Sequence, residues 1–332
     1  MMKTATTLHE LAKRLNLSTA TVSRALKDHP NIAPDTKARV LKLADELDYE
    51  PNAYAVSLRT SSSKEFGIIV PTLTGFFNDS LISSIQEGCR KEGYSVLIFV
   101  SDNDPEAELS CLKICKQRQV DGIFISITSN TSDLEPFQKL NRLGTPVVFV
   151  DRVPTSSTDH KVCFEDETLA RFSAQYIINK GKQNVLALFG HHQLSISQKR
   201  LKAFEEEFAN AGRSQNLTIR NTQGNEAAAE RVLQDLKSSN NYDTIFCMTD
   251  EILIGAMKSL QTLGLRAPKD IGILCMSNGF FPKLYQPEIT YVETSGVQLG
   301  QLALNHMFSI LNNEEVPKAS NLPPQIIEGG SI

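Results

Sequence analysis

Four small or polar side chains between residues 19 and 24 share one face of a predicted helix, where they could contact a polar surface such as DNA. They are Thr19, Ala20, Ser23 and Arg24. Val22, Ala25 and Leu26 would face inward, so this helix would bury one face and expose the other. A second short helix with an exposed polar face is typical of a helix-turn-helix, in which that helix enters the major groove. This stretch by itself supports two interpretations about equally: a helix-turn-helix, and an ordinary helical hairpin with a solvated face.

Capping patterns predict where the helices around this face begin. Thr7 and Glu10 have the S/T-x-x-E spacing of a capping box, which predicts a first helix start. Ser18 predicts a second start, because a serine side chain accepts hydrogen bonds from exposed backbone N–H groups. Residues 33–48 carry an apolar stripe at helical spacing, with Pro34 in the first turn, and predict a third helix. Three such helices would share one small core.

From residue 66 onward, short continuous apolar runs alternate with helical stretches. Continuous apolar runs predict strands buried on both faces, and therefore parallel strands between helix layers. The predicted strands are 66–70, 95–100, 122–127, 146–150, 184–189, 244–248, 271–276, 289–294 and a last one within 324–329. The predicted helices are about 78–92, 105–118, 133–143, 166–180, 197–211, 225–238, 251–263 and 297–311. This alternation predicts the α/β class, with open, doubly wound parallel sheets.

A polar segment at 151–162 divides the α/β region into two lobes. The predicted domains are a helix-turn-helix DNA-binding domain (1–49), a hinge helix and linker (50–64) and an effector-binding domain (65–332). Lobe one would comprise about 65–160 and 292–320, and lobe two about 161–291 and 321–332. Ligands bind parallel sheets at the carboxyl ends of the strands. The cleft between the lobes is therefore the expected ligand site.

Charge is distributed unevenly along the 332 residues, whose net charge is −4. Residues 1–63 carry nine Lys or Arg and seven Asp or Glu, so the head is +2 and the remainder is −6. A basic N-terminal region and an acidic remainder are typical of a protein that binds phosphate groups through its N-terminal region only. No apolar stretch approaches the length of a transmembrane helix, and the N-terminus lacks the apolar core of a signal peptide. A cytoplasmic location without membrane contact is expected.

Signatures of catalysis, cofactor binding and metal binding are missing from the sequence. There is no G-x-x-x-x-G-K-[S/T] loop, and no G-x-G-x-x-G follows a strand. His191 and His192 follow a predicted strand, but a polar loop is favoured because no further ligand stands at metal-site spacing. The six cysteines, including Cys111 and Cys115 on one helical face, are expected to be reduced packing residues. No enzyme activity, metal or cofactor is expected, and a sugar-modifying enzyme is a remote alternative.

The segment LHELAKRLNLSTATVSRALKDHPNIAPDTKARVLKLADELDYEPNAYAVSLR resembles the N-terminal domain of the lactose-repressor (LacI/GalR) family of bacterial transcription regulators. Its specific marks are TVSRAL, then a third helix, then YEPN with a leucine seven residues after the proline. The body motifs VDGIFIS, PVVFVDR, KRLKAFEEEFANAG, FCMTDEILIGAMKSL, GLRAPKDIGIL and LGQLA follow the order of that family. The resemblance covers nearly the whole chain. It implies a two-lobed body similar to a periplasmic sugar-binding protein.

The resemblance implies how the head would bind double-stranded DNA. Thr19 and Ala20 would meet base edges in the major groove, and Arg24 would contact bases and backbone, since arginine binds guanine bidentately. Leu58 of the hinge helix would wedge into a minor-groove base step, with packing on the body as the less favoured alternative. The implied DNA contacts are Thr7, Ser18, Thr19, Ala20, Thr21, Ser23, Arg24, Asn31, Tyr49, Asn52, Ala55 and Leu58. One head makes few contacts, so a homodimer on a near-palindromic operator is expected.

The resemblance also implies a small-molecule effector in the cleft, usually a sugar or sugar derivative. The implied effector contacts are Phe76, Phe77, Ser126, Asp151, Arg152, Ser197, Arg200, Thr249 and Asn278. Asp250 is favoured instead as the N-cap of the helix that follows it. The chain departs from the family pattern at Ser277-Asn278, where many members carry an acidic pair, and at EGGS (328–331). The predicted function is a sequence-specific repressor of carbohydrate-utilisation genes, and a regulator with a purine-type corepressor is the alternative.

Overall fold

A computed structural model of the protein describes residues 6–50, 60, 62–155, 158–192, 194–238 and 241–332. The chain forms two compact units, Met1–Ser63 and Lys64–Ile332. Most of the predicted hinge helix lies outside the described residues, and so do the predicted DNA contacts Asn52, Ala55 and Leu58.

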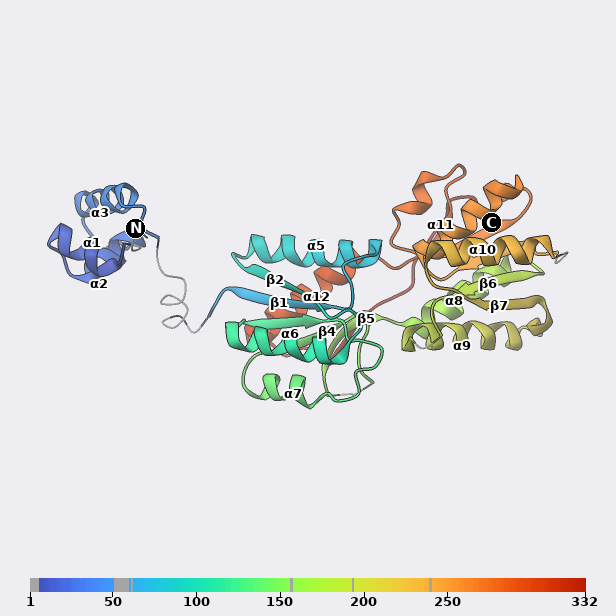
Figure 1. Cartoon of the computed structure of the whole chain (residues 1–332), viewed down its shortest axis with the longest axis horizontal. Coiled ribbons are helices and arrows are strands. Elements are labelled where there is room, and N and C mark those ends of the chain that lie inside the picture. Colours follow the sequence, from blue (N-terminus) through green and yellow to red (C-terminus); the bar gives the residue numbers. More distant parts are fainter. Residues whose placement is uncertain (1–5, 51–59, 61, 156–157, 193, 239–240) are drawn as a thin grey trace. The chain divides into compact units, whose positions relative to one another are not determined.

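The N-terminal unit contains the three predicted helices, α1 (Leu8–Leu15), α2 (Thr19–Leu26) and α3 (Pro34–Glu46) (Figure 1). Both predicted caps are confirmed. Thr7 Oγ1 accepts from the Glu10 N–H at 3.2 Å, and Ser18 Oγ accepts from the Thr21 N–H at 3.0 Å. All three helices contribute to one buried core, whose members are Leu11, Ala12, Val22, Ala25, Val40 and Ala44. This core fixes α2 with its polar face outward.

Lobe one of the second unit is a six-stranded parallel sheet in the order β11-β5-β4-β3-β1-β2. Its strands are β1 (Glu65–Val70), β2 (Ser95–Val100), β3 (Gly122–Ile125), β4 (Val147–Val150), β5 (His160–Phe164) and β11 (Ala319–Leu322). Helices α5 (Phe76–Lys91) and α12 (Gly296–Leu311) cover one face, where they pack against Phe66 and Ile68. Helices α6 (Pro105–Arg118) and α7 (Glu135–Arg142) cover the other, against Ile69. Burial on both faces explains the continuous apolar strands.

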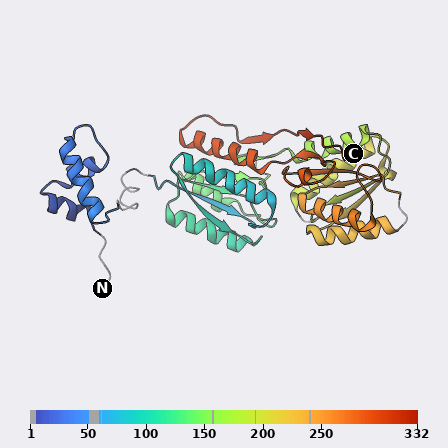
Figure 2. The same cartoon turned by 90° about the horizontal axis from the view of Figure 1, so that it is seen from above.

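Lobe two is a second six-stranded sheet in the order β12-β10-β9-β8-β6-β7, in which only β12 is antiparallel. Its strands are β6 (Val185–Phe189), β7 (Leu217–Asn221), β8 (Thr244–Cys247), β9 (Gly272–Ser277), β10 (Thr290–Glu293) and β12 (Ile326–Ile327). Its helices pack in two pairs, α8 (Asp166–Asn179) with α9 (Ser195–Asn210), and α10 (Gly224–Lys237) with α11 (Asp250–Leu263). Short 3₁₀ turns lie at Ser214–Asn216 and Phe281–Leu284. The chain passes between the lobes after β5, β10 and β11, so three connecting segments join the two sheets, and Figure 2 shows the two lobes from above.

The predicted fold class is confirmed, but three strands were missed and the lobe boundaries need correction. Strands β5, β7 and β11 lie at or next to a sheet edge, where polar and half-exposed residues interrupt the apolar run. Because β5 pairs with β4, residues 161–164 belong to lobe one rather than lobe two. Because β10 pairs with β9, residues 292–293 belong to lobe two, and the return to lobe one comes with α12. Residues 321–322 belong to lobe one, because β11 pairs with β5.

The cysteines pack as predicted. Cys111 and Cys115 lie in the core between α6 and the lobe-one sheet, and burial raises the pKa of the Cys115 thiol to about 12. Among the described residues, no three histidine, cysteine, aspartate or glutamate side chains gather as a metal site would require. Within the same residues, no helix combines the length and apolar character needed to cross a bilayer.

Candidate functional site

The outer face of α2 presents the side chains predicted to contact DNA. Ser18, Thr19, Ala20 and Arg24 are exposed, and Thr21 and Ser23 are half-buried. The Oγ atoms of Ser18 and Thr21 lie 2.8 Å apart, which holds both hydroxyls at the start of the helix. The small side chains of Thr19 and Ala20 would allow the start of the helix to approach the base edges in a DNA groove closely. The Arg24 side chain is exposed one turn further along the helix. The arrangement is that of a recognition helix.

Three further predicted DNA contacts, Thr7, Asn31 and Tyr49, lie outside α2. Thr7 caps α1 with its hydroxyl. Tyr49 is half-buried against the head core, its N–H donates to the Ala44 carbonyl at 2.8 Å, and burial raises the pKa of its phenol. Asn31 is exposed in the loop between α2 and α3. The structure therefore gives Thr7 and Tyr49 structural roles.

Between the two lobes of the second unit lies a cleft at the carboxyl ends of the strands. Its inner part is a cavity of about 160 Å³ lined from both lobes, with Phe77, Asp151 and Phe164 on one side and Arg200, Asp250 and Met276 on the other. A wider cavity of about 550 Å³ continues from it and shares Arg152, Leu194 and Thr249. The predicted location of the ligand site matches this cleft.

Arg200 is one of two arginines that line the inner cavity, the other being Arg152. Its Nε and Nη2 both lie 2.9 Å from Oδ1 of Asp166, the first residue of α8. The pair is almost fully buried, since the two side chains are 7% and 14% exposed. Asp166 was not foreseen, because thirty-four residues separate it from Arg200 and only the packing of α8 on α9 joins them. The ion pair fixes the direction of the guanidinium.

Asp151 and Arg152 follow β4 and line the cleft, as predicted. Asp151 has a positive φ of 63°, a backbone conformation that turns the chain sharply at the strand end. Burial raises the pKa of its carboxyl from 3.8 to about 6, an effect that the nearby Arg152 and Arg200 oppose. The Arg152 Nη1 donates to Asn103 Oδ1 at 2.8 Å. Asp151 thus offers hydrogen-bonding oxygens in a low-polarity surrounding.

Thr249, predicted as an effector contact, lines both cavities and also caps α11, whereas Asp250 is not the N-cap that was predicted. Thr249 is the N-cap of α11, where its hydroxyl accepts from the Ile252 N–H at 3.3 Å. Asp250 is buried and accepts from the Ser277 hydroxyl and, at 3.0 Å, from the Asn278 N–H. Burial raises the pKa of its carboxyl, and these two hydrogen bonds lower it. The prediction of Asp250 as the N-cap is wrong. Thr249 is the N-cap of α11, and the Asp250 carboxylate instead accepts hydrogen bonds from Ser277 and Asn278 at the end of β9.

Asn278, predicted as an effector contact, instead joins the lobes. Its Nδ2 donates to the Phe76 carbonyl at 3.1 Å, and its Oδ1 accepts from Ser80 Oγ and from the Gly296 N–H, each at 3.2 Å. Both ends of the amide are therefore engaged, and Asn278 is not among the residues that line the cavities. We call Asn278, Phe76, Ser80 and Gly296 the interlobe clasp.

Ser126 and Ser197 lie behind the cleft wall. They are 3% and 1% exposed, and neither hydroxyl has a hydrogen-bond partner among the described residues. A Cβ on Gly190, which lines the wider cavity, would lie 2.9 Å from Ser197 Oγ. Neither serine lines a cavity itself, so the structure supports them as neighbours of the site rather than as contacts.

Phe76 and Phe77 diverge although they are adjacent. Phe77 lines the inner cavity and its ring centroid lies 6.1 Å from that of Phe164, tilted by 58°. Phe76 lines the wider cavity, is 39% exposed and packs edge-on against Phe281, with centroids 4.2 Å apart. Because Phe164 is the last residue of a strand that was not predicted, the second aromatic wall of the cavity was missed.

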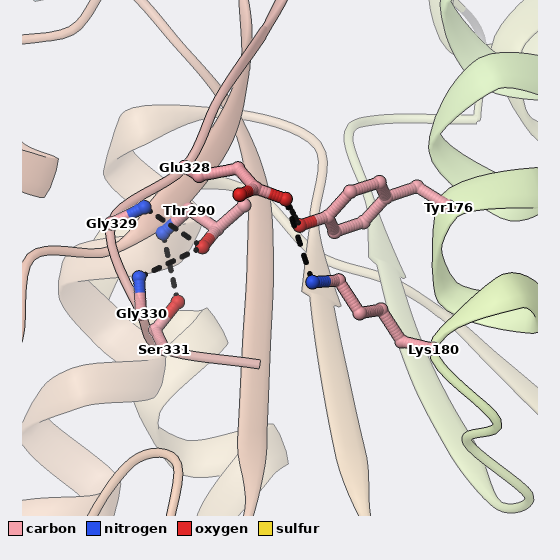
Figure 3. A network of polar contacts seen from close by, with 7 residues as sticks. All are labelled: Tyr176, Lys180, Thr290, Glu328, Gly329, Gly330 and Ser331. Carbon is pink, nitrogen blue, oxygen red and sulfur yellow. Dashed lines mark hydrogen bonds and ion pairs between the residues drawn. The ribbon is translucent and has the colours of Figure 1, made fainter.

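The EGGS segment (328–331) makes the polar contacts to lobe two that Figure 3 shows, and none of its residues lines the inner or the wider cavity. Glu328 accepts from the Tyr176 hydroxyl at 2.7 Å and from Lys180 at 3.4 Å. The Ser331 hydroxyl accepts from the Thr290 N–H at 2.8 Å, and Ser331 is fully buried. The departure from the family pattern at 328–331 is therefore structural.

These features define a class of protein: a DNA-binding transcriptional regulator with an effector-binding domain. Residues 7–52 match the family described as bacterial regulatory proteins, lacI family. Residues 63–328 match the family described as periplasmic binding proteins and sugar binding domain of LacI family. The chain belongs to the LacI family. Since this is a family of regulatory proteins, the chain is a regulator rather than an enzyme.

Relatives and solved structures span nearly the full length of the chain. The chain is 26% identical over 318 residues to the HTH-type transcriptional repressor PurR of Vibrio vulnificus, covering 94% of each protein. It is 26% identical over 329 residues to catabolite control protein A of Priestia megaterium, covering 97% of each. The Lac repressor dimer bound to operator and the anti-inducer ONPF has the same fold, with a TM-score of 0.87, 19% identity and 99% of each chain covered.

Proposed function

We propose that the protein is a dimeric repressor of carbohydrate-utilisation genes that binds a near-palindromic operator and is controlled by a sugar in the interlobe cleft. The observation that carries the proposal is the inner cavity, in which an arginine fixed by a buried ion pair faces a carboxyl group and two aromatic rings. Sugar hydroxyls both donate and accept hydrogen bonds, and sugar ring faces pack on aromatic side chains.

The DNA-binding part of the proposal rests on α2. Its exposed residues Thr19, Ala20 and Arg24 combine a methyl-bearing face with a bidentate donor, which are the groups that read thymine and guanine in the major groove. Asn52, Ala55 and Leu58 belong to the proposal as minor-groove contacts from the hinge. A regulator that meets the chromosome in this way would act in the bacterial cytoplasm.

An exposed apolar patch supports the dimer. Phe76, Phe280 and Leu284 are 39%, 58% and 63% exposed. The ring of Phe281 contacts both Phe76 and Phe280, so the patch is continuous and draws on both lobes. Exposed apolar patches of this kind mark protein interfaces. A second copy of the chain covering it would couple the lobe arrangement of one subunit to that of the other.

The test begins with selection of the operator. Purified protein would first select duplexes from a random library, and a palindromic consensus with two half-sites is expected. The affinity of the protein for that duplex would then be measured by fluorescence anisotropy in the absence of ligand, with neutral sugars and with purines. A sugar that changes operator affinity and loses its effect in Arg200→Ala supports the proposal. An effect confined to purines would support the alternative corepressor, and a consensus without symmetry would contradict the dimer.

A further inference from the structure

The effector cleft continues beyond the inner cavity into two further cavities. The wider middle cavity of about 550 Å³ adjoins an outer one of about 350 Å³, and the two share His191, Thr222 and Gln223. The inner cavity, at about 160 Å³, is smaller than the roughly 300–1,000 Å³ typical of small-molecule sites. It has room for one sugar ring, and the middle cavity has room for more.

The cavities follow one another along the lobe-two sheet. Met276 and Thr294 place the inner cavity at the ends of β9 and β10, and Met248 at the end of β8 is shared with the middle cavity. The middle cavity continues past β6 at Gly190 to β7 at Thr222. From β10 to β7 there are four strand spacings of about 4.8 Å, so the line of cavities spans roughly 19 Å.

Thr222 marks the far end of the middle cavity as a polar site. It is 8% exposed, and its Oγ1 is buried without a hydrogen-bond partner among the described residues. A buried unpaired hydroxyl costs free energy unless a partner satisfies it. Since Thr222 lines both the middle and the outer cavity, a ligand that reaches it from the inner cavity would supply that partner.

The charges of the lining disfavour an anionic ligand. The inner cavity is lined by three carboxylates, Asp151, Asp250 and Glu251, and by two arginines, Arg152 and Arg200. Arg200 is already neutralised by Asp166. Burial also raises the pKa of Asp151 to about 6, so this environment disfavours negative charge. A phosphorylated sugar would meet repulsion where a neutral sugar meets hydrogen-bond acceptors.

We propose that the effector is a neutral carbohydrate of two or more rings, with one ring in the inner cavity and the next in the middle cavity, where it reaches Thr222. This inference rests on the proposed function and specifies its ligand. The first ring would lie between Phe77 and Phe164, near Asp151 and Arg200. The second would lie beside Arg152 and Asn103.

The test is calorimetric titration of the full-length protein with matched series of neutral saccharides. The series are glucose, cellobiose and cellotriose; glucose, maltose and maltotriose; and galactose, lactose and melibiose, with glucose 6-phosphate as the anionic probe. We expect a disaccharide or trisaccharide to bind more tightly than its own monosaccharide. The Thr222→Val variant keeps the side-chain shape but lacks the hydroxyl. Its affinity for the disaccharide or trisaccharide should be about 3- to 10-fold lower than that of the unmodified protein, the range for one hydrogen bond. Binding of the monosaccharide should be unchanged.

Thr262→Val is the matched control, since Thr262 is exposed and its hydroxyl bonds within α11 to the Lys258 carbonyl. It should leave the affinity of both ligands unchanged. A monosaccharide that binds as tightly as its longer homologues, or glucose 6-phosphate binding more tightly than glucose, would overturn this inference and leave the proposed function standing. If no saccharide binds, or none that binds changes operator affinity, the proposed function itself fails.

Discussion

Nε and Nη2 of Arg200 both lie 2.9 Å from Oδ1 of Asp166, in a pair that joins α9 to α8 at the inner end of the cleft. Removing one partner of a buried ion pair leaves the other charge uncompensated and costs about 3–5 kcal/mol. Loss of either partner alone would therefore destabilise lobe two, and the pair also fixes the direction in which the guanidinium meets a ligand.

Arg200→Ala should abolish effector binding, with a loss of about 100-fold or more in affinity by calorimetry, or ~2.7 kcal/mol. It should leave binding to the selected operator intact. Arg220→Ala is the matched control, because Arg220 also pairs with a buried aspartate, Asp235, at 2.9 Å. This control should lower the unfolding free energy and keep the effector response. An Arg200→Ala protein that still responds to the effector would show that the cleft is assigned wrongly.

Arg24→Ala should weaken specific DNA binding without affecting the cleft. A bidentate contact to guanine contributes about 1–3 kcal/mol of discrimination, so each subunit should lose about 10- to 100-fold in operator affinity. Fluorescence anisotropy with the selected duplex measures this. Arg39→Ala, an exposed arginine on α3, provides the comparison. Equal losses in the two variants would indicate general electrostatic attraction rather than base reading.

Asp151→Asn should stabilise the protein at neutral pH and weaken effector binding. The pKa of Asp151 is about 6 in the folded state, above its ordinary 3.8. Its contribution to stability is therefore complete below pH 3.8 and is lost as the pH rises through 6. Since the side chain is partly exposed, the variant should gain about 1–2 kcal/mol at pH 7.5. Urea unfolding at pH 4.5 and 7.5 checks this, and an equal gain at both values would refute the assignment.

Asn278→Ala should alter the coupling between the lobes rather than the ligand contacts. Loss of the amide leaves the Phe76 carbonyl and the Gly296 N–H without their partner in the interlobe clasp, at about 1–3 kcal/mol for such unsatisfied groups. We expect faster hydrogen exchange at the Gly296 amide and a changed effector response of operator binding. Exchange at Gly296 equal to that of the unmodified protein would show that the clasp does not hold the lobes.

Ser331→Ala should destabilise lobe two and leave both binding functions unchanged. The hydroxyl accepts from the Thr290 N–H (Figure 3) and donates to the Ile273 carbonyl at 2.6 Å, and Ser331 is fully buried. A loss of about 1–3 kcal/mol in the free energy of unfolding is expected from the unsatisfied backbone groups. Thermal unfolding measures it. If the Ser331→Ala protein lost effector affinity under conditions in which it is fully folded, Ser331 would belong to the effector site.

The sequence alone determined the elements and most of the cleft. Helix caps such as Thr7 and Ser18 depend on residues close in the sequence, and strands buried on both faces are continuous apolar runs. Both can therefore be recognised from the sequence alone. The edge strands β5, β7 and β11 were missed because half-exposed strands lack that pattern.

Only the tertiary structure decided which side chains meet. Asp166 beside Arg200, Phe164 opposite Phe77 and Asn278 against Phe76 are separated by 34 residues or more in the chain. Their contacts depend on how helices and strands of one or both lobes pack. The residue types alone do not indicate which elements will pack together. The same packing buried the Thr222 hydroxyl with no hydrogen-bond partner in the described part of the chain, and it lined up three cavities that no local pattern of the sequence could indicate.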